Sequence, residues 1–483
     1  MINLITTDNN KTTDNNNGKT LKELYKNWNN LQNEPDYQSI YDTLTVAANV
    51  QLKDIVSENL LIFPKKLGEN EDEIGELSII GLSGSREKAG EAKITTGNLM
   101  GFVGIRRKGN PDEAKSVYLT IRSRFSGDND YFMQYMLQKV FAINLFDYKF
   151  TTGKDAIFNL MLFLFPYMLK KAMRQGIFRT YRTFRRNDAN IKGTIDISCH
   201  IRMNIPFAGR IAYNSRERTP DNPIMQLIRH TIEEIKASPF GKSVLNCGED
   251  MRGNVKAVIE NTPSYSRLDR EKVIRQNIRP FSHPYFTEYK PLQKLCLNIL
   301  RHKKISFSQS DKDEVYGILF DGAWLWEEYL NTVLQKSGFN HSKNKATSNK
   351  NGISVYIENN YKLYPDFYRK LREEASQNAI LDAKYKRVDG NGISPEDLHQ
   401  LIAYIHILPA CKGGLIYPSS QQIEGIKPDI KGTLNGYGGQ IFTVGIPIPK
   451  ADNFPDFCEK MQNMEQELAE QARNNFLRKN NMP

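Results

Sequence analysis

The sequence predicts a mixed α/β protein with a strand-bearing first part, a helical middle part and a mixed last part. Three observations favour this class. Short alternating segments such as 117–122 are typical of strands, the middle carries apolar residues at helical spacing, and the last third alternates strand-like and helical stretches. With 483 residues the chain exceeds what one hydrophobic core usually serves, so several domains are expected.

The first part begins with residues 1–18, which are rich in Asn, Thr and Asp and are expected to form a flexible tail. Residues 19–127 follow as a mixed, strand-bearing domain, with strands expected at 98–105 and 117–122. No catalytic spacing occurs in this region. We therefore expect it to have a docking or structural role.

The middle part, 128–310, is expected to be mainly helical, with helices at 131–142, 156–173, 223–235 and 289–301. Within it, the segment 174–186 alternates arginines with aromatic residues. Arg179, Arg182 and Arg186 could line one face and contact DNA phosphates. Alternatively, the aromatic residues are core and the arginines form a solvated face, and the sequence leaves both interpretations open.

The last part, 311–483, begins with a predicted helix at 319–335 that carries Glu327 beside Glu328. Two strand-like segments then carry Asp366 and Asp382. A further helix is expected to begin after Ser394, a good N-cap residue followed by proline at the first helical position. Strands at 414–417 and 441–446 and a charged helix at 456–479 complete this region.

Side-chain alternation in the strand around Asp382 gives this region a chemical interpretation. Asp382 and Lys384 point to the same face of a strand, and Asp366 arrives from the preceding segment. Two carboxylates and a lysine on one sheet face suit metal-dependent phosphodiester hydrolysis. Asp366, Asp382 and the backbone carbonyl of Ala383 could hold Mg²⁺, with Mn²⁺ as an alternative.

The remaining candidates surround that core. Lys384 could orient the attacking water or stabilise negative charge on the phosphate. Glu327 is a candidate outer ligand or second-metal ligand, although Glu328 adjoins it. Gln400 could orient the Lys384 ammonium or contact the phosphate, with Tyr404 one helical turn further along.

The composition and short motifs of the chain indicate what kind of partner it has and where in the cell it is expected. The net charge is +11 and the isoelectric point about 9.1, which favours a polyanionic partner. Five isolated cysteines suggest neither a zinc site nor a disulfide framework, and a reduced cytoplasmic location is expected. The N-terminus lacks the pattern of a signal peptide, and no apolar run is long enough to span a membrane. Gly18-Lys19-Thr20 and Gly241-Lys242-Ser243 both lack the leading glycine of a phosphate-binding loop, so nucleotide hydrolysis would need another protein.

Taken together, PDF at 365–367, ILDAKYK at 380–386 and HQLIAY at 399–404 resemble the PD-(D/E)xK nuclease superfamily in its QxxxY variant. The stretches 175–197 and 217–232 are similar to the McrC family, the nuclease subunits of McrBC modification-dependent restriction systems. The resemblance covers about residues 170–420. It implies a restriction-endonuclease-like core and catalytic roles for Asp366, Asp382 and Lys384.

The same resemblance implies a division of labour. A McrB-like AAA+ GTPase hexamer would bind GTP, read the modified base and deliver DNA, while this chain docks, stimulates GTP hydrolysis and cuts. Two alternatives remain open. The chain could be a nuclease that needs no motor, or an adaptor that binds DNA and activates a ring without cutting.

Overall fold

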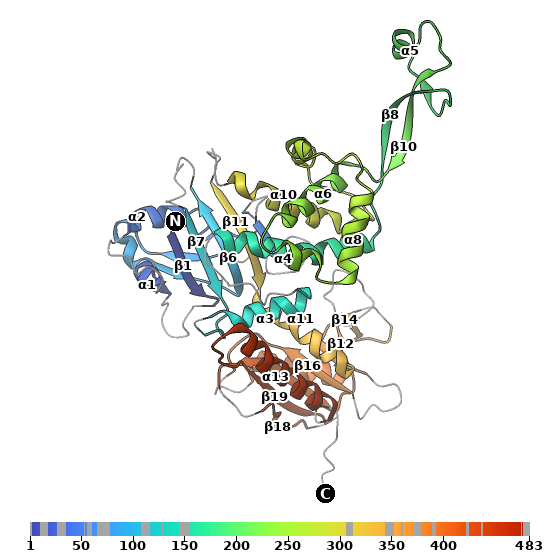
Figure 1. Ribbon diagram of the computed structural model, residues 1–483. Coiled ribbons are helices and arrows are strands. Elements are labelled where there is room, and N and C mark those ends of the chain that lie inside the picture. Colours follow the sequence, from blue (N-terminus) through green and yellow to red (C-terminus); the bar gives the residue numbers. More distant parts are fainter. Residues whose placement is uncertain are drawn as a thin grey trace. The chain divides into compact units, whose positions relative to one another are not determined.

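The structure, a computed structural model, describes residues 2–9, 18–26, 35–52, 54–55, 60–64, 78–107, 116–127, 129–143, 154–305, 313–342, 352–358, 361–370, 378–388, 393–421, 425–435, 438–474 and 476. The chain divides into two compact units. Unit 1 combines residues 1–157 with 309–483, and unit 2 comprises 158–308 (Figure 1). A mixed α/β architecture is confirmed by the sheets and helices found.

Unit 1 contains a five-stranded sheet in the order β1-β7-β6-β11-β3. Its strands are β1 (Ile2–Thr7), β3 (Leu60–Phe63), β6 (Leu99–Arg106), β7 (Val117–Arg122) and β11 (Glu314–Asp321). The strands predicted at 98–105 and 117–122 are thus confirmed.

The expectation of a flexible tail is wrong for its first residues. β1 pairs in parallel with β7 along its whole length, and the Leu4 side chain is fully buried. The apolar residues at alternate positions 2 and 4 supply the buried face that a strand needs, whereas the polar composition was dominated by residues 8–17. Residues 10–17 lie outside the described residues.

Strand β11 belongs to this sheet although it follows the whole of unit 2 in the sequence. It pairs antiparallel with β6 and parallel with β3. The sequence placed these residues at the start of the last region, and the predicted helix at 319–335 begins three residues later, at Gly322, because 319–321 finish the strand. Backbone pairing across the chain overrode the local helical pattern.

A smaller sheet in the order β2-β5-β4 and two helices cover the first part of unit 1. The elements are β2 (Lys19–Thr20), β4 (Gly81–Ser83), β5 (Lys93–Thr95), α1 (Leu21–Lys26) and α2 (Tyr37–Leu44). Leu21, Leu24, Ile40 and Leu44 join Ile105 and Leu119 of the large sheet in one apolar core. The helices thereby bury one face of the sheet.

The last part of unit 1 is a six-stranded sheet in the order β12-β15-β16-β17-β19-β18. Its strands are β12 (Asn340–His341), β15 (Phe367–Arg369), β16 (Ala379–Ala383), β17 (Lys412–Ser419), β18 (Asp429–Thr433) and β19 (Gln440–Pro447). A short hairpin of β13 (Ile353–Ser354) and β14 (Lys362–Leu363) precedes β15. β16, β17 and β19 run parallel, and β15 is antiparallel to β16.

Four helices accompany this sheet: α3 (Tyr131–Phe141), α11 (Gly322–Leu334), α12 (Pro395–Ile407) and α13 (Phe454–Asn474). Leu401 and Ile405 of α12 pack on Ile380 and Leu415, which places α12 on one face. The predicted helix at 456–479 corresponds to α13, and its last positions 475 and 477–479 lie outside the described residues.

Unit 2 is a group of helices with a projecting β-hairpin. The helices are α4 (Lys154–Arg174), whose first turn belongs to unit 1, and α6 (Pro223–Lys236), α7 (Gly241–Leu245), α8 (Glu249–Glu260), α9 (Arg270–Gln276) and α10 (Tyr289–Ile305). The predicted helices at 156–173, 223–235 and 289–301 are confirmed. No helix among the described residues is both long and apolar enough to cross a membrane.

The hairpin consists of β8 (Thr180–Asp188) and β10 (Ile211–Thr219) (Figure 1). The short β9 (Thr194–Ile195) pairs with β10. The helix α5 (Ile197–Met203) lies at the distal end of the hairpin. We call residues 180–219 the arm. The arginine-rich segment of the sequence is therefore mostly a strand of the arm rather than part of the helical body.

Candidate active site

Strand β16 presents two of the predicted catalytic residues on one face. The Lys384 Nζ lies 2.7 Å from Asp382 Oδ2. Ile380, two residues before Asp382, packs into the core under α12, so this face of the strand is the one that α12 covers. The strand ends at Ala383, but the Lys384 amide still donates to the Ile416 carbonyl at 2.9 Å. The alternation inferred from the sequence is therefore correct.

Asp366 joins this pair from the start of β15. Its Oδ2 accepts a hydrogen bond from the Ala383 amide at 2.7 Å. The antiparallel register of Phe367 with Leu381 brings the two strands together at this point. Asp366, Asp382 and Lys384 are thus adjacent, although 15 residues separate the two aspartates in the sequence.

Helix α12 supplies the next layer of contacts. Lys384 Nζ donates to Gln400 Oε1 at 3.1 Å, and Gln400 Nε2 donates to the Tyr404 hydroxyl at 2.9 Å. Ser394 caps the helix by accepting from the Asp397 amide at 3.3 Å, as its position in the sequence predicts. The structure therefore brings Gln400 and Tyr404 to the lysine in the predicted order.

Asp397 was not among the predicted site residues. Its Oδ1 lies 3.5 Å from Lys384 Nζ, and its Oδ2 pairs with Lys386 and accepts from the Ser394 hydroxyl. The sequence marked Asp397 as an acid in the first turn of a capped helix, a position that usually serves the helix end alone. Its ion pairs with two lysines of the β16 segment depend on how α12 packs on the sheet.

Glu327 reaches the site from α11. Its Oε1 lies 3.5 Å from Nδ1 of His341, and the same nitrogen lies 2.9 Å from the Asp366 carbonyl oxygen. Glu328 Oε1 lies 3.9 Å from His341 Nε2. Burial, followed by the charges of Asp366, Glu328 and Asp382, opposes the ionisation of Glu327 and raises its pKa. The His341 side chain is 7% exposed, and this residue was not among the predicted site residues.

Burial and neighbouring carboxylates disfavour the charged forms of the carboxyl groups in the site. Burial, followed by the charge of Asp382, raises the pKa of Asp366. Burial also raises the pKa of Asp382, although Lys384 opposes that change. Burial and the charges of Asp366, Glu328 and Asp382 raise the pKa of Glu327 well above its usual range. For Lys384, burial acts to lower the pKa, but the neighbouring Asp382 carboxylate outweighs it and the pKa rises.

This donor set fits a hard divalent cation. Carboxylate and carbonyl oxygens are the ligands that Mg²⁺ prefers, and a cation would offset the burial and the repulsion that together raise these pKa values. In the described part of the chain, no three His, Cys, Asp or Glu side chains converge closely enough to hold a metal ion. The fit therefore depends on two carboxylates, Asp366 and Asp382, with a backbone carbonyl such as that of Ala383.

The predicted DNA-contacting arginines lie on the arm. Arg182 and Arg186 are exposed and flank the Phe184 ring, with guanidinium carbons 5.6 and 5.5 Å from its centroid. Arg186 also pairs with Glu217 across the hairpin at 2.9 Å. Arg179 precedes the strand and differs from Arg182 by an odd number of positions, so strand alternation places it on the other face. The common face predicted for three arginines therefore holds only for Arg182 and Arg186.

The model of one protein family matches most of the chain. The model of the family described as McrBC 5-methylcytosine restriction system component matches residues 94–418, which is 325 of the 483 residues. No curated protein matches the chain. The match therefore spans both units and every candidate site residue.

Two solved structures from Thermococcus gammatolerans are similar to the chain. One is the refined half-complex from a tetradecameric assembly of McrB AAA+ hexamers with bound McrC, at 15% identity and a TM-score of 0.48 over 96% of this chain and 100% of that chain. The other is the cryo-EM structure of the McrBC complex, at 14% identity and a TM-score of 0.31 over 69% of this chain and 88% of that chain.

Proposed function

Because the chain belongs to the McrBC 5-methylcytosine restriction system component family, we propose that it is the subunit that cuts DNA, as a Mg²⁺-dependent endodeoxyribonuclease of the PD-(D/E)xK type. The observation that carries the proposal is the cluster of Asp366, Asp382 and Lys384. The ammonium of Lys384 is held 2.7 Å from Asp382 and 3.1 Å from Gln400. The strand–strand–helix–strand order of β15, β16, α12 and β17 supports it.

Each residue has a definite task in this proposal. Asp366, Asp382 and the carbonyl of Ala383 would hold the metal ion. Mg²⁺, when bound, would neutralise charge on the phosphodiester and favour ionisation of the attacking water. Lys384 carries its positive charge beside the carboxylates and can orient the water or stabilise the developing charge on phosphate. Gln400 accepts a hydrogen bond from Lys384 and donates one to the Tyr404 hydroxyl, and these contacts would hold the ammonium in place.

Two further groups support the first set. Asp397 Oδ1 lies 3.5 Å from Lys384 Nζ, so its negative charge attracts the ammonium from the side of α12. Glu327 contacts His341, which holds the backbone of Asp366, so we assign Glu327 the role of an outer ligand. The exposed Arg182 and Arg186 of the arm are proposed to contact DNA phosphates.

The proposed partner is a McrB-like AAA+ GTPase hexamer, which this chain would also stimulate. In one of the T. gammatolerans structures, McrC is bound to McrB AAA+ hexamers. The sequence contains no complete phosphate-binding loop of the G-x-x-x-x-G-K-[ST] type, which agrees with an NTPase acting in trans. Family membership is the main support for this partner.

The test combines the full chain with a candidate McrB-like protein on methylated and unmodified DNA. We expect cleavage that needs Mg²⁺ and the partner, and that is lost in Asp382→Ala. GTP hydrolysis by the partner should still be stimulated by Asp382→Ala. Cleavage that survives this substitution would refute the site. Strong cutting without a partner would indicate a stand-alone nuclease, and stimulation without any cutting would indicate an adaptor.

A further inference from the structure

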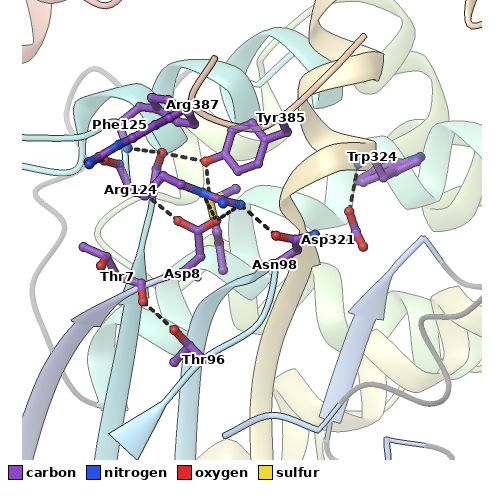
Figure 2. Close-up of polar contacts among 12 residues, drawn as sticks. Thr7, Asp8, Thr96, Asn98, Arg124, Phe125, Asp321, Trp324, Tyr385 and Arg387 are labelled. Atoms are coloured by element: carbon purple, nitrogen blue, oxygen red, sulfur yellow. Dashed lines mark hydrogen bonds and ion pairs between the residues drawn. The ribbon is translucent and has the colours of Figure 1, made fainter. Parts of the chain in front are cut away.

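The residue that follows the proposed catalytic lysine is buried on the opposite side of the strand. Tyr385 shares a 2.6 Å hydrogen bond between its hydroxyl and the Ser123 Oγ, and its hydroxyl lies 3.2 Å from the Met100 Sδ (Figure 2). Ser123 directly follows β7, and Met100 belongs to β6. Tyr385 therefore ends among the strands of the five-stranded sheet.

The ring of Tyr385 is held as firmly as its hydroxyl. The Arg124 guanidinium carbon lies 4.9 Å from the ring centroid, and Phe125 meets the ring edge to face at 5.1 Å. Gly322, at the start of α11, leaves room for the ring, since a Cβ there would lie 2.7 Å from Tyr385 Cε1. Little freedom remains for this side chain.

Arg124 is itself fixed by buried partners. It pairs with Asp8 at 2.9 Å, and the two side chains are only 9% and 0% exposed. Its guanidinium also donates to Asn98 Oδ1 at 2.7 Å, and its carbonyl accepts from Arg387 at 3.2 Å (Figure 2). Asp8 directly follows β1. The ends of β1, β6 and β7 thus converge on the segment that follows β16.

Lys384 lies just beyond the end of its strand. β16 ends at Ala383, and beyond the Lys384 amide the chain leaves the six-stranded sheet. Successive Cα atoms are about 3.8 Å apart, so a fixed Tyr385 restricts the backbone of Lys384 directly. The Lys384 side chain contacts the carboxylate of Asp382, whereas the side chain of the next residue, Tyr385, contacts Ser123 beside the other sheet.

We propose that Tyr385, held by Ser123 and Arg124, is a positioning residue for Lys384, so that the five-stranded sheet sets where the lysine ammonium lies. We call these three residues the tyrosine anchor. The consequence for cleavage rests on the proposed nuclease function, whereas the placement of the lysine does not. A displacement at the ends of β1, β6 or β7 would reach Lys384 through the tyrosine anchor.

The test uses the full chain and two substitutions that remove the same hydrogen bond from opposite sides, Tyr385→Phe and Ser123→Ala. The matched control is Tyr316→Phe, which removes a buried hydroxyl bonded at 2.9 Å to Tyr118 in the same five-stranded sheet. Amine labelling by an acylating reagent, read by mass spectrometry, reports the exposure of Lys384. The exposed Lys256, at 77%, serves as the internal reference.

We expect Lys384 to be labelled about fivefold faster in Tyr385→Phe and Ser123→Ala than in the unaltered chain, as for loss of the buried hydrogen bond that both substitutions remove. The control should label like the unaltered chain while losing a similar amount of thermal stability. Equal labelling of Lys384 in all four proteins would overturn the proposal, as would an equal increase in the control. Should Tyr385→Phe fail to fold, Ser123→Ala decides the question alone.

Cleavage assays separate this inference from the proposed function. With partner, DNA and Mg²⁺ saturating, both variants should lower the single-turnover cleavage rate about fivefold and leave DNA affinity unchanged. A chain that never cuts DNA, yet shows faster labelling of Lys384 in both variants, would refute the nuclease function and support the tyrosine anchor. Unchanged labelling in a chain that does cut DNA would overturn the anchor alone.

Discussion

Replacing Lys384 with methionine should destabilise the metal-free protein, and the effect should grow with pH. The substitution keeps the apolar stem and removes the cation that lies 2.7 Å from Asp382 and 3.5 Å from Asp397. At an effective dielectric constant of about 20, a unit-charge pair at the shorter distance is worth about 6 kcal/mol before desolvation is subtracted. Breaking such a pair on one side leaves about 3 kcal/mol of net destabilisation.

We take about 3 kcal/mol, the lower end of the destabilisation expected on breaking a buried ion pair, because the Lys384 side chain is 22% exposed, although that of Asp382 is only 2% exposed. The direction with pH follows from Asp382, whose pKa burial raises and Lys384 lowers. Without the lysine this pKa rises further. A carboxyl group with a higher pKa in the folded chain stabilises it below the unfolded pKa, about 4, and loses that stabilisation as pH rises through the folded pKa.

Thermal unfolding without divalent metal at pH 5 and pH 8 measures this. We expect Lys384→Met to lower the Tm by about 5 °C at pH 8 and by less at pH 5. The matched control is Lys386→Met, which removes a lysine that is 43% exposed and paired with Asp397, and which should cost less than about 1 kcal/mol. Equal effects of the two substitutions, or a larger loss at pH 5, would refute the reasoning.

Two other substitutions test the surroundings of the site and the arm. Gln400→Leu removes the 3.1 Å acceptor of Lys384 and should lower the single-turnover cleavage rate about tenfold at unchanged DNA affinity, whereas the exposed neighbour His399→Leu should leave the rate unchanged. Arg182→Ala should weaken DNA binding and reduce the slope of log affinity against log salt by about 1, while Lys256→Ala on α8 should not. An unchanged salt slope together with a lower Tm would make Arg182 a structural residue.

The sequence could predict the central cluster because its geometry is local. Asp382 and Lys384 share a face through strand alternation, and Gln400 and Tyr404 share one through helical spacing. The Ser394 cap likewise depends on residues three positions apart. Such patterns are set by the backbone of one element, so they survive whatever the rest of the chain does.

The arm shows where local pattern is ambiguous. Arginines and aromatics at 174–186 fit a helix face as well as a strand, and the partner strand β10 lies about 30 residues away. Because residues 180–188 pair with β10, they form one strand of a hairpin. That pairing separates Arg179 from Arg182 and Arg186, which three-residue and four-residue spacing had joined.

Contacts between segments that lie far apart in the chain could not be predicted from the sequence. β1 belongs to a sheet only because β7 lies beside it, and β11 joins β6 from 208 positions further along at the Arg106–Glu314 ion pair. The hydrogen bond between Ser123 and Tyr385 spans 262 positions. The residue types and spacing of this chain thus determined which groups can act together on one strand or helix. Tertiary packing alone decided what holds them in place, because it depends on which surfaces meet and not on periodicity along the chain.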